Sequence, residues 1–576
     1  MKRNLFALLS LLVLASLVLA ACGGGGQEVE GFPGAIAFPE GGKSATGAWS
    51  QEPDNIVPYF TQMSYAIWIT QLTLVGLAEW DDQGNFVPEL AAEVPTADNG
   101  GVSADGLTIT WKLKEGLKWS DGEPITSADV KFTWEAVMDP GNAPTSRTGY
   151  DKIASVETPD DQTVVITFSE LYPPWQTLFT QGPNNGGAIL PKHVLEGKTA
   201  LESDPFIHQP SVGSGPFIIT EWVAGDHMTL LPNKNFYKGR PVLDQVQIKF
   251  VPTPETALAA LQTGDVDWYP DFSESDIATL KDMQGQGVLG FKVVPGADFE
   301  HYFFNMGTTT GVDGSGAADV DGFCPFKDIR VRKAITLGIN RQAFVDSLLS
   351  GETIVPATQW PNSSWTNSSL QADAYDPDAA MALLEEAGYT DADGDGVREG
   401  KCNGEDVKLS FNFETTDKQI RVDIALATQS DLAKIGVEFK PIHTPAGTFF
   451  GTYADGGPMP TGNYNMAGYT TGFYPDPYTD NYKCESVPSA ANPSGTNWYL
   501  NCDPVLSDMM EEMNASSDPS VRKEKLDAAQ QYIFENYYVI MMYARANIYG
   551  YSNRFVPGPF GFFSNQNWNA EVWDVK

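Results

Sequence analysis

Two periods of hydrophobic residues alternate along the chain, the two-residue period of strands and the longer period of helices. Residues 107–113 carry apolar side chains at every second position, which predicts a half-buried strand. Thr126 then precedes a helical stripe, with Asp129 three positions later, a pair typical of a capped helix start. Asp139-Pro140 predicts the end of this helix.

A strand, a helix and a second strand are predicted in the second half of the chain. Apolar residues alternate over 407–413, recur at helical spacing over 420–436 and resume over 437–441, where a proline ends the strand. Asp376-Pro377 and Asp518-Pro519 have the form of helix starts. Because strands and helices mix along the whole length, we expect an α/β or α+β protein with several open sheets.

The first 21 residues predict the signal peptide of a lipoprotein. Lys2 and Arg3 precede an apolar run that ends in Leu19-Ala20-Ala21-Cys22, which supplies small residues before the cleaved bond and a thiol to carry lipid. Residues 22–44 are rich in glycine and proline and are expected to form a flexible tether. The alternatives are an uncleaved membrane helix, which needs about twenty apolar residues, and a signal peptide in which Cys22 is incidental.

The composition describes an exported, acidic, globular chain. No later stretch is long or apolar enough to span a bilayer, so we expect the mature chain in the cell envelope, touching the membrane through its lipid alone. The 74 acidic residues outnumber the 36 basic ones and give a net charge of −38, which excludes nucleic acid as a natural partner. A hydrophobic content of 42% is ample for large cores, and this length divides into two or three domains.

Four cysteines remain once Cys22 is assigned to lipid, and an even number in an oxidising compartment predicts two disulfides. Of the three connectivities we favour Cys484–Cys502, whose members are close in sequence, which leaves Cys324 with Cys402. A zinc site is the rival interpretation, but no CxxC motif and no histidine lies nearby.

Nothing in the sequence has the spacing of a known enzyme motif. The five histidines are scattered without HExxH or HxH spacing, and no Gly-x-Ser-x-Gly elbow occurs. Gly42-Lys43-Ser44 resembles the end of a phosphate-binding loop, but Ala37 stands in place of its first glycine. We therefore expect a protein that is not an enzyme and requires no cofactor.

One acidic segment has the oxygen spacing of a calcium-binding loop, formed by Asp391, Asp393 and Asp395. Cys402 stands where a bidentate glutamate belongs, and Glu399 is the candidate substitute. A structural calcium ion is one interpretation, and an acidic, glycine-rich turn without a metal is the other.

Several motifs, in order along the mature chain, resemble those of the family 5 extracellular solute-binding proteins. These proteins are the dipeptide, oligopeptide, nickel and oligosaccharide receptors of ABC importers. The motifs are residues 105–130, Gly213-Ser-Gly-Pro-Phe217, residues 326–335, Tyr375-Asp-Pro-Asp, Tyr474-Pro-Asp-Pro477 and Ile540-Met-Met-Tyr543.

The resemblance implies an α/β, two-lobed, periplasmic-binding-protein-like (Venus flytrap) fold with an extra inserted domain. Lobe one would take residues 45–74, 212–300 and 542–576, the inserted domain 75–211, and lobe two 301–541. All four remaining cysteines would then lie in lobe two, which leaves the hinge free.

The function implied is capture of an extracellular oligopeptide or oligosaccharide by a monomer that delivers it to an ABC permease and its ATPase. The two lobes would close around the solute, and the ligand must favour the closed form by its own contacts. The alternatives are a surface hydrolase and a non-transport sensor on the same fold. Nickel is the least expected ligand because histidines are few.

The resemblance also marks candidate ligand contacts. In peptide-binding members an acidic residue three positions before the acidic residue of the Tyr-Pro-Asp-Pro motif pairs with the ligand's α-amine, and here that position is Phe473. Aromatic faces with nearby hydroxyl groups suit sugar rings or apolar peptide side chains. The expected ligand contacts are Tyr302, Tyr469, Thr470, Thr471, Phe473 and Tyr543.

Overall fold

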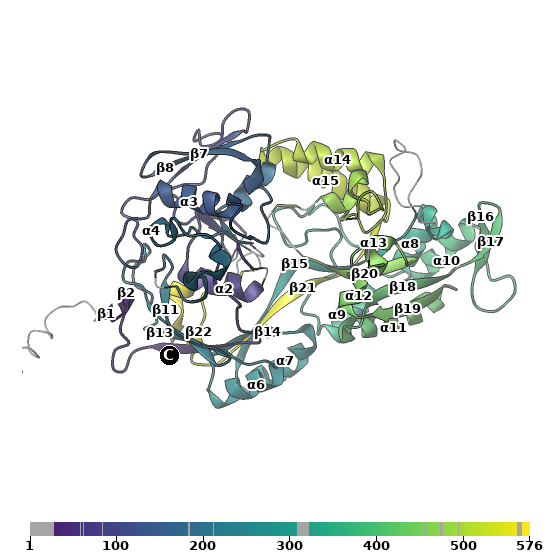
Figure 1. Ribbon diagram of the computed structural model, residues 1–576. Helices are drawn as coiled ribbons and strands as arrows, with labels where there is room; N and C mark the ends of the chain where they lie inside the picture. The colour runs from purple at the N-terminus through teal and green to yellow at the C-terminus, as the bar shows by residue number, and fades with distance from the viewer. Residues whose placement is uncertain are drawn as a thin grey trace, which may run out of the picture.

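Two lobes joined by two long strands make up the molecule (Figure 1). The computed structural model describes residues 28–57, 59–61, 63–82, 84–182, 185–210, 212–307, 322–453, 455–472, 476–477, 479–493, 495–561 and 567–576, with the Asn185 side chain left out. Cys22 and Phe473 lie outside the described residues. Within the described part of the chain, no helix combines the length and the apolar character needed to cross a membrane.

One ten-stranded sheet runs through both lobes in the order β11-β12-β13-β3-β14-β21-β15-β20-β18-β19. Its first five strands, with helices α6 and α7, define the first lobe, and β20, β18 and β19 belong to the second. The bounds are β3 Ser44–Trp49, β11 Phe217–Val223, β12 His227–Pro232, β13 Gln245–Phe250, β14 Trp268–Phe272, β15 Gly290–Phe304, β18 Ser410–Thr416, β19 Glu438–Thr444, β20 Met466–Thr471, β21 Val539–Tyr551, α6 Pro254–Thr263 and α7 Ile277–Gly285.

Strands β15 and β21 carry the chain from one lobe to the other. They pair antiparallel from Gly290 opposite Tyr551 in the first lobe to Phe303 opposite Val539 in the second. The register shifts between Pro295 and Phe299 and again just after Glu300, where the strands leave the first lobe. Such bulges bend and twist a strand pair, so this stretch is the natural hinge.

Two small sheets, β10-β9-β4-β5 and β6-β8-β7, form with α3 and α4 what we call the small-sheet region. It shares one hydrophobic core with the first lobe, which includes the fully buried Trp49, Trp111 and Trp119. The bounds are α2 Ser64–Thr73, β4 Ala78–Trp80, β5 Phe86–Pro88, β6 Thr108–Lys112, α3 Ser127–Met138, β7 Ile153–Asp160, β8 Thr163–Phe168, β9 Gln181–Gly182, β10 Asn185–Gly186, α4 Lys192–Leu195 and α5 Pro205–His208.

The predicted strand at 107–113 and the helix that follows it are confirmed as β6 and α3. Asp129 accepts a hydrogen bond from the backbone N–H of Thr126 at 2.8 Å, which completes the capping box at the start of α3. Asp139 ends the helix, as Asp139-Pro140 predicts.

The second lobe packs helices around β18, β19 and β20, and its helices α14 and α15 extend toward the small-sheet region (Figure 1). Its other bounds are α8 Ile329–Leu337, α9 Arg341–Leu348, α10 Pro377–Glu386, β16 Glu399–Cys402, β17 Glu405–Lys408, α11 Gln419–Ala433, α12 Ala446–Phe449, α13 Pro458–Thr461, α14 Pro504–Asn514 and α15 Pro519–Glu535. The predicted strand-helix-strand unit is confirmed, because β18 and β19 pair in parallel on either side of α11 in the sequence.

Two details of that unit differ from the sequence pattern. The alternating residues 407–413 do not form one strand, since β17 ends at Lys408 in a hairpin with β16 and β18 begins at Ser410 in the large sheet. Pro441 does not end the second strand, because β19 is the edge of the sheet and a residue without an N–H is tolerated there.

The flexible tether expected over residues 22–44 is wrong for residues 28–36, which form regular structure. Strands β1 (Glu28–Val29) and β2 (Phe32–Ile36) form a hairpin. Ala35 is fully buried against Ile218 and Leu231 of the first lobe, so this apolar surface holds the segment in place despite its glycines and prolines. The residues from Glu28 to Ile36 are therefore ordered, although they fall within the predicted tether.

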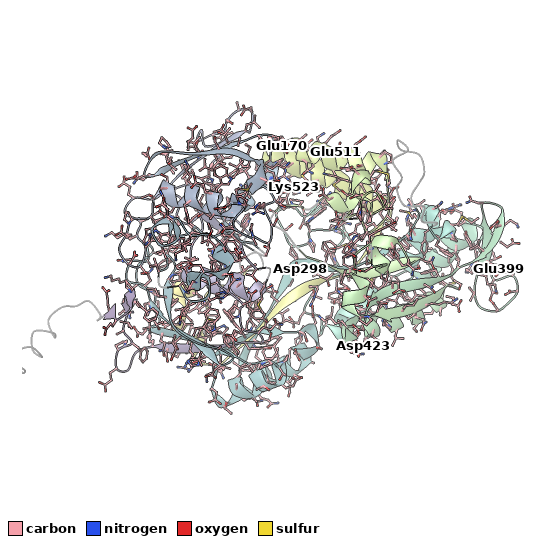
Figure 2. The ribbon with its side chains drawn as sticks, viewed as in Figure 1. Glu170, Asp298, Glu399, Asp423, Glu511 and Lys523 are labelled. Carbon is pink, nitrogen blue, oxygen red and sulfur yellow. A yellow bond between two sulfur atoms is a disulfide. The ribbon has the colours of Figure 1, made fainter. Side chains whose placement is uncertain are left out.

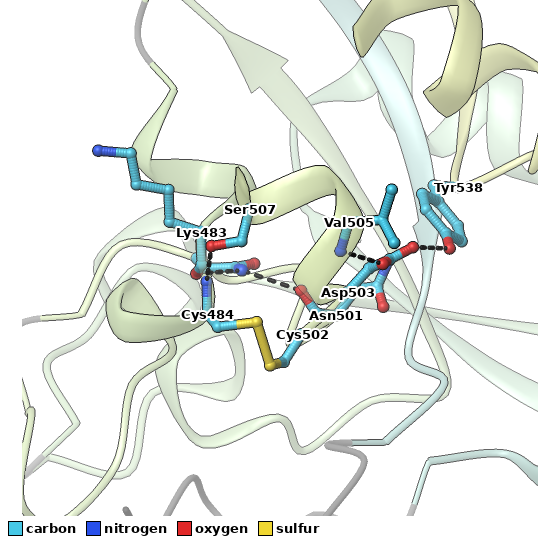
Figure 3. Close-up of a disulfide and its surroundings, with 9 residues drawn as sticks. Lys483, Cys484, Asn501, Cys502, Asp503, Val505, Ser507 and Tyr538 are labelled. Atoms are coloured by element: carbon cyan, nitrogen blue, oxygen red, sulfur yellow. Dashed lines mark hydrogen bonds between the residues drawn. A yellow bond between two sulfur atoms is a disulfide. The ribbon is translucent and has the colours of Figure 1, made fainter. Parts of the chain in front are cut away.

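Both predicted disulfides are present in the second lobe. Cys324 and Cys402, with Cα atoms 6.1 Å apart, join the start of a helical segment to the β16–β17 hairpin. Cys484 and Cys502 close a shorter loop with Cα atoms 4.5 Å apart (Figure 3). Next to the second bridge, Asp503 accepts hydrogen bonds from the Val505 N–H and the Tyr538 hydroxyl, which fix the start of α14.

Removing the disulfides should destabilise the second lobe in a definite order. The Cys324→Ala/Cys402→Ala variant loses a bridge over 78 residues, and we expect a loss of about 2–4 kcal/mol in the free energy of unfolding. The Cys484→Ala/Cys502→Ala variant loses a bridge over 18 residues and should lose about 1 kcal/mol less, because a short loop restricts the unfolded chain less. Urea unfolding without reductant measures both, and the reverse order would contradict the entropic account.

Candidate functional site

A cavity of about 900 Å³ lies between the small-sheet region and the second lobe. One wall comes from Tyr59 and residues 145–187, and the other from residues 476–514. Helices α14 and α15 approach the small-sheet region (Figure 1), and Asn514 at the end of α14 lines the cavity. A cavity of this size, between two bodies that a hinge connects, is a place where a small solute can touch both at once.

Three tyrosines supply the aromatic part of the cavity wall. The Tyr59 hydroxyl donates to the Ala188 carbonyl at 2.9 Å, and the Tyr150 hydroxyl donates to the Tyr59 oxygen at 3.3 Å. Burial raises the pKa of Tyr150 and of Tyr172 to about 12, so both phenols stay neutral. The wall thus combines ring faces with neutral hydroxyl groups.

The charged side chains that line the cavity have partners within the chain. Asp476 is held by both terminal nitrogens of Arg522, with Nη2 at 2.8 Å from Oδ1, and Arg522 also stacks on Trp365. Lys152 pairs with Glu170, and Lys483 pairs with Asp480 at 3.1 Å. The carboxylate of the Tyr-Pro-Asp-Pro motif is therefore committed to an arginine, and the cavity presents little net charge.

The alternation of β20 separates the expected ligand contacts onto two faces. Tyr469 packs in a cluster of rings with His301, Phe450 and Trp498, at centroid distances of 5.0, 5.6 and 6.1 Å, and Thr471 lies on the same face. Thr470 points to the opposite face. The structure thus brings Tyr469 and Thr471 together and separates them from Thr470.

Thr470 belongs to a buried ion pair instead of an open surface. Arg421 of α11 contacts Glu300 of β15, Nε to Oε1 at 2.7 Å, and its Nη2 donates to the Thr470 hydroxyl at 2.8 Å. Glu300 is 2% exposed. A buried ion pair of this kind requires such additional hydrogen bonds, so Thr470 completes the pair.

Tyr302 and Tyr543 were expected to contact the ligand, but both are buried in a hydrophobic core. Tyr302 is packed against Phe413 at a centroid distance of 4.3 Å in the core of the second lobe. Tyr543, opposite Glu300 in the register, is buried in the same core. The bulges of β15 and β21 decide which side chains face the core, and the sequence pattern does not show where they fall.

His301 is buried and carries no charge in the ordinary pH range. Its Nε2 lies 3.0 Å from the Tyr499 hydroxyl, and burial lowers its pKa to about 4. It is therefore a neutral member of the ring cluster around Tyr469.

Two carboxylates that the sequence analysis did not single out lie near the crossing strands. Asp271, at the end of β14, accepts hydrogen bonds from the Ser50 N–H at 3.0 Å and the Tyr65 hydroxyl at 2.8 Å. Asp298 lies in the bulge of β15, below the space between the lobes (Figure 2), with Oδ1 4.0 Å from where a side chain at Gly472 would begin. Neither stands in a motif, and only the fold brings Asp271 to Ser50.

The acidic segment places three of its four predicted ligands together. One oxygen from each of Asp391, Asp393 and Asp395 lies within 4.8 Å of the others. Glu399 does not join them, because its Oε1 accepts the backbone N–H groups of residues 392 and 393. The Lys408 ammonium group lies 2.8 Å from Asp393 and also contacts Asp395, so a cation of the chain itself occupies this cluster.

Two lobes joined by a bulged strand pair, with a cavity whose walls come from both sides, are the arrangement of a protein that binds a solute between its lobes. The chain belongs to family 5 of the bacterial extracellular solute-binding proteins. The model described as "Bacterial extracellular solute-binding proteins, family 5 Middle" matches residues 85–489. The family expected from the sequence is confirmed.

Known proteins of the same kind agree over most of the chain. The oligopeptide-binding protein AppA of Bacillus subtilis (strain 168) is 28% identical over 450 residues, which are 76% of each chain. The structure of AppA with a nonapeptide has a TM-score of 0.63 at 22% identity, covering 94% of this chain and 100% of AppA. NikZ of Campylobacter jejuni with Ni(L-His) has a TM-score of 0.66 at 24% identity, covering 92% and 99%. The two-lobed α/β fold is therefore confirmed.

Calcium should leave the melting temperature of the wild-type protein unchanged, because Lys408 already pairs with two of the three carboxylates of the acidic cluster. The Lys408→Ala variant leaves three exposed carboxylates without that partner and should gain a calcium-dependent rise in melting temperature. Lys401→Ala, which removes an exposed ion pair with Asp406 in the same hairpin, is the control. Scanning calorimetry with calcium or with EGTA measures the effect, and a rise in the wild type would show that the cluster binds calcium despite the lysine.

Proposed function

We propose that this protein captures oligopeptides in the cavity between its lobes and delivers them to the permease of an ABC importer. The observation that carries the proposal is the 900 Å³ cavity, which has tyrosine rings on the wall of the small-sheet region and prolines and paired charges on both walls. It suits an extended, largely uncharged solute several residues long. The oligopeptide-binding relative AppA supports the same ligand class.

An oligosaccharide is the second candidate. The neutral hydroxyl groups and ring faces of Tyr59, Tyr150 and Tyr172 are also what sugar rings require. Phe473, where peptide-binding members carry the acidic residue, favours this candidate as well.

Binding would act through closure of the two lobes. At the outer rim, a side chain added at Gly106 of the small-sheet region would lie 2.5 Å from the Ser517 hydroxyl, so the turn between α14 and α15 touches the opposite body. We place the boundaries between the lobes inside β15 and β21, close to residues 300 and 542. A ligand that contacts both walls would stabilise this closed form, which the permease would recognise, while the ATPase supplies the energy for transport.

We further propose that the protein acts without catalysis, as a monomer in the cell envelope that is anchored to the outer face of the cytoplasmic membrane, or held in the periplasm, through lipid on Cys22. The carboxylates of the cavity support the first point, because Asp476 and Asp480 are each paired with a cation and neither is placed as a free acid or base. The small residues before Cys22 support the lipid anchor.

Native mass spectrometry and thermal shift should identify the ligand class. We expect mixed peptides to raise the melting temperature and malto- and cello-oligosaccharides to leave it unchanged, since a ligand at a hundred times its Kd adds about 2.7 kcal/mol. Tyr172→Ala should weaken peptide binding about tenfold by removing one ring face, whereas Tyr375→Ala, outside this cavity, should not. Stabilisation by the sugars alone would replace the peptide proposal with the second candidate, and turnover of any compound would refute a purely binding role.

Lipid attachment is tested separately. Cells fed an alkyne-tagged fatty acid should label the wild-type protein, and the Cys22→Ala variant should lose the label and leave the membrane fraction. The Cys324→Ala/Cys402→Ala variant, which also removes cysteines, should keep it. A labelled Cys22→Ala protein would contradict the assignment.

A further inference from the structure

Asp271 stands at the carboxyl ends of two parallel strands. It comes near the end of β14, beside Ser50, the residue that directly follows β3. Helix α2, which carries Tyr65, lies on the side of the first lobe that faces the second (Figure 1). In open α/β sheets, ligands bind in the crevice outside the carboxyl ends of parallel strands. Asp271 thus occupies the part of the first lobe where a ligand is expected.

Other buried carboxylates near the crossing strands are neutralised by arginine. Asp267, just before β14, pairs with Arg554 at 2.6 Å, and Glu274, just after β14, pairs with Arg545 at 2.9 Å. Glu300 of β15 likewise pairs with Arg421. The chain therefore supplies a cation to the carboxylates on either side of Asp271 in the sequence.

Asp271 has hydrogen-bond donors but no such cation. Its partners are the Ser50 N–H and the Tyr65 hydroxyl, and no lysine, arginine or histidine in the described part of the chain forms an ion pair with it. Burial raises the pKa of Asp271, because its hydrogen bonds do not fully offset the cost of removing the charged carboxylate from water. A cation from a ligand would offset the cost of burying this negative charge.

Aromatic rings surround the same carboxylate. Tyr65, Tyr269 and Tyr549 all lie close enough for its charge to raise the pKa of their hydroxyl groups. Tyr65 in turn contacts the rings of Trp68 at 4.6 Å and Trp49 at 6.0 Å. A carboxylate with aromatic side chains close by can attract an ammonium group by ion pairing, and a neighbouring ring can add a cation–π contact.

We propose that Asp271 binds the positively charged group of the ligand, which in a peptide is the terminal ammonium group, at a point of the first lobe outside the residues that line the 900 Å³ cavity. The inference rests on the proposed function, because it names the end of the peptide that the first lobe recognises. It also explains how Phe473 can stand where peptide-binding members carry an acidic residue, since the carboxylate would come from the opposite lobe.

The test uses two synthetic pentapeptide libraries without lysine, arginine or histidine, one with free amino termini and one N-acetylated. Bound peptides are counted by mass spectrometry after gel filtration of the full mature chain. The wild-type protein should retain the free library about tenfold or more over the acetylated one, a typical effect of a partly buried ion pair. Asp271→Asn, which keeps the size and the hydrogen-bonding oxygen, should lose that preference.

Two variants serve as controls. Asp265→Asn removes the same charge from an exposed residue before β14 and should keep the wild-type preference. Asp298→Asn tests the carboxylate in the bulge of β15, and loss of the preference there, with Asp271→Asn unaffected, would overturn the proposal. If Asp271→Asn fails to fold, Asp271→Glu, which retains the charge but displaces it, should reduce the preference, and an unchanged preference would count against Asp271.

The remaining outcomes separate this inference from the proposed function. Equal retention of the two libraries by the wild type would refute the role of Asp271 and leave peptide capture standing. Retention of neither library would refute peptide capture, and spermidine then serves as a cation probe. Spermidine binding that Asp271→Asn abolishes would keep the cation site, whereas no spermidine binding would overturn both.

Discussion

The pairing of β15 with β21 is the constraint on which the rest of the molecule depends. These two strands run through both lobes, and the ten-stranded sheet is continuous because of them. Every other strand of the sheet belongs to one lobe, so the relative position of the two walls of the cavity is set where this pair bends. The bulges between residues 295 and 301 concentrate the bending in a few residues.

Charged groups reinforce the two ends of this pair. Glu274 and Arg545 connect the turn after β14 to β21, while Glu300 and Arg421 connect β15 to α11. Across the lobes, Lys281 of α7 contacts Glu352 of the second lobe. Buried pairs add little net stability compared with apolar packing, but each is costly to break, so they hold each lobe rigid and leave the bulged stretch as the place that can move.

The sequence predicted the features that depend on near neighbours. Thr126 and Asp129 lie three residues apart and form the capping box that their spacing indicates, and the Cys484–Cys502 bridge spans a short loop. It failed where distant segments decide the outcome. The bulges turn Tyr302 and Tyr543 to the core, the alternating residues 407–413 divide between two sheets, and Asp271 meets Ser50 across 221 residues. Family resemblance filled part of this gap, because it carries the topology that local patterns lack.

The hairpin of β1 and β2 has a consequence for where the protein works. It fixes the chain to the first lobe from Glu28 onward, and Glu28 follows Cys22 by six residues. A segment of six residues spans at most about 20 Å when it is fully extended. A lipid on Cys22 would therefore keep the first lobe within about 20 Å of the bilayer. A permease in the same membrane would then meet its receptor at a high local concentration, as two modules joined by a short linker do.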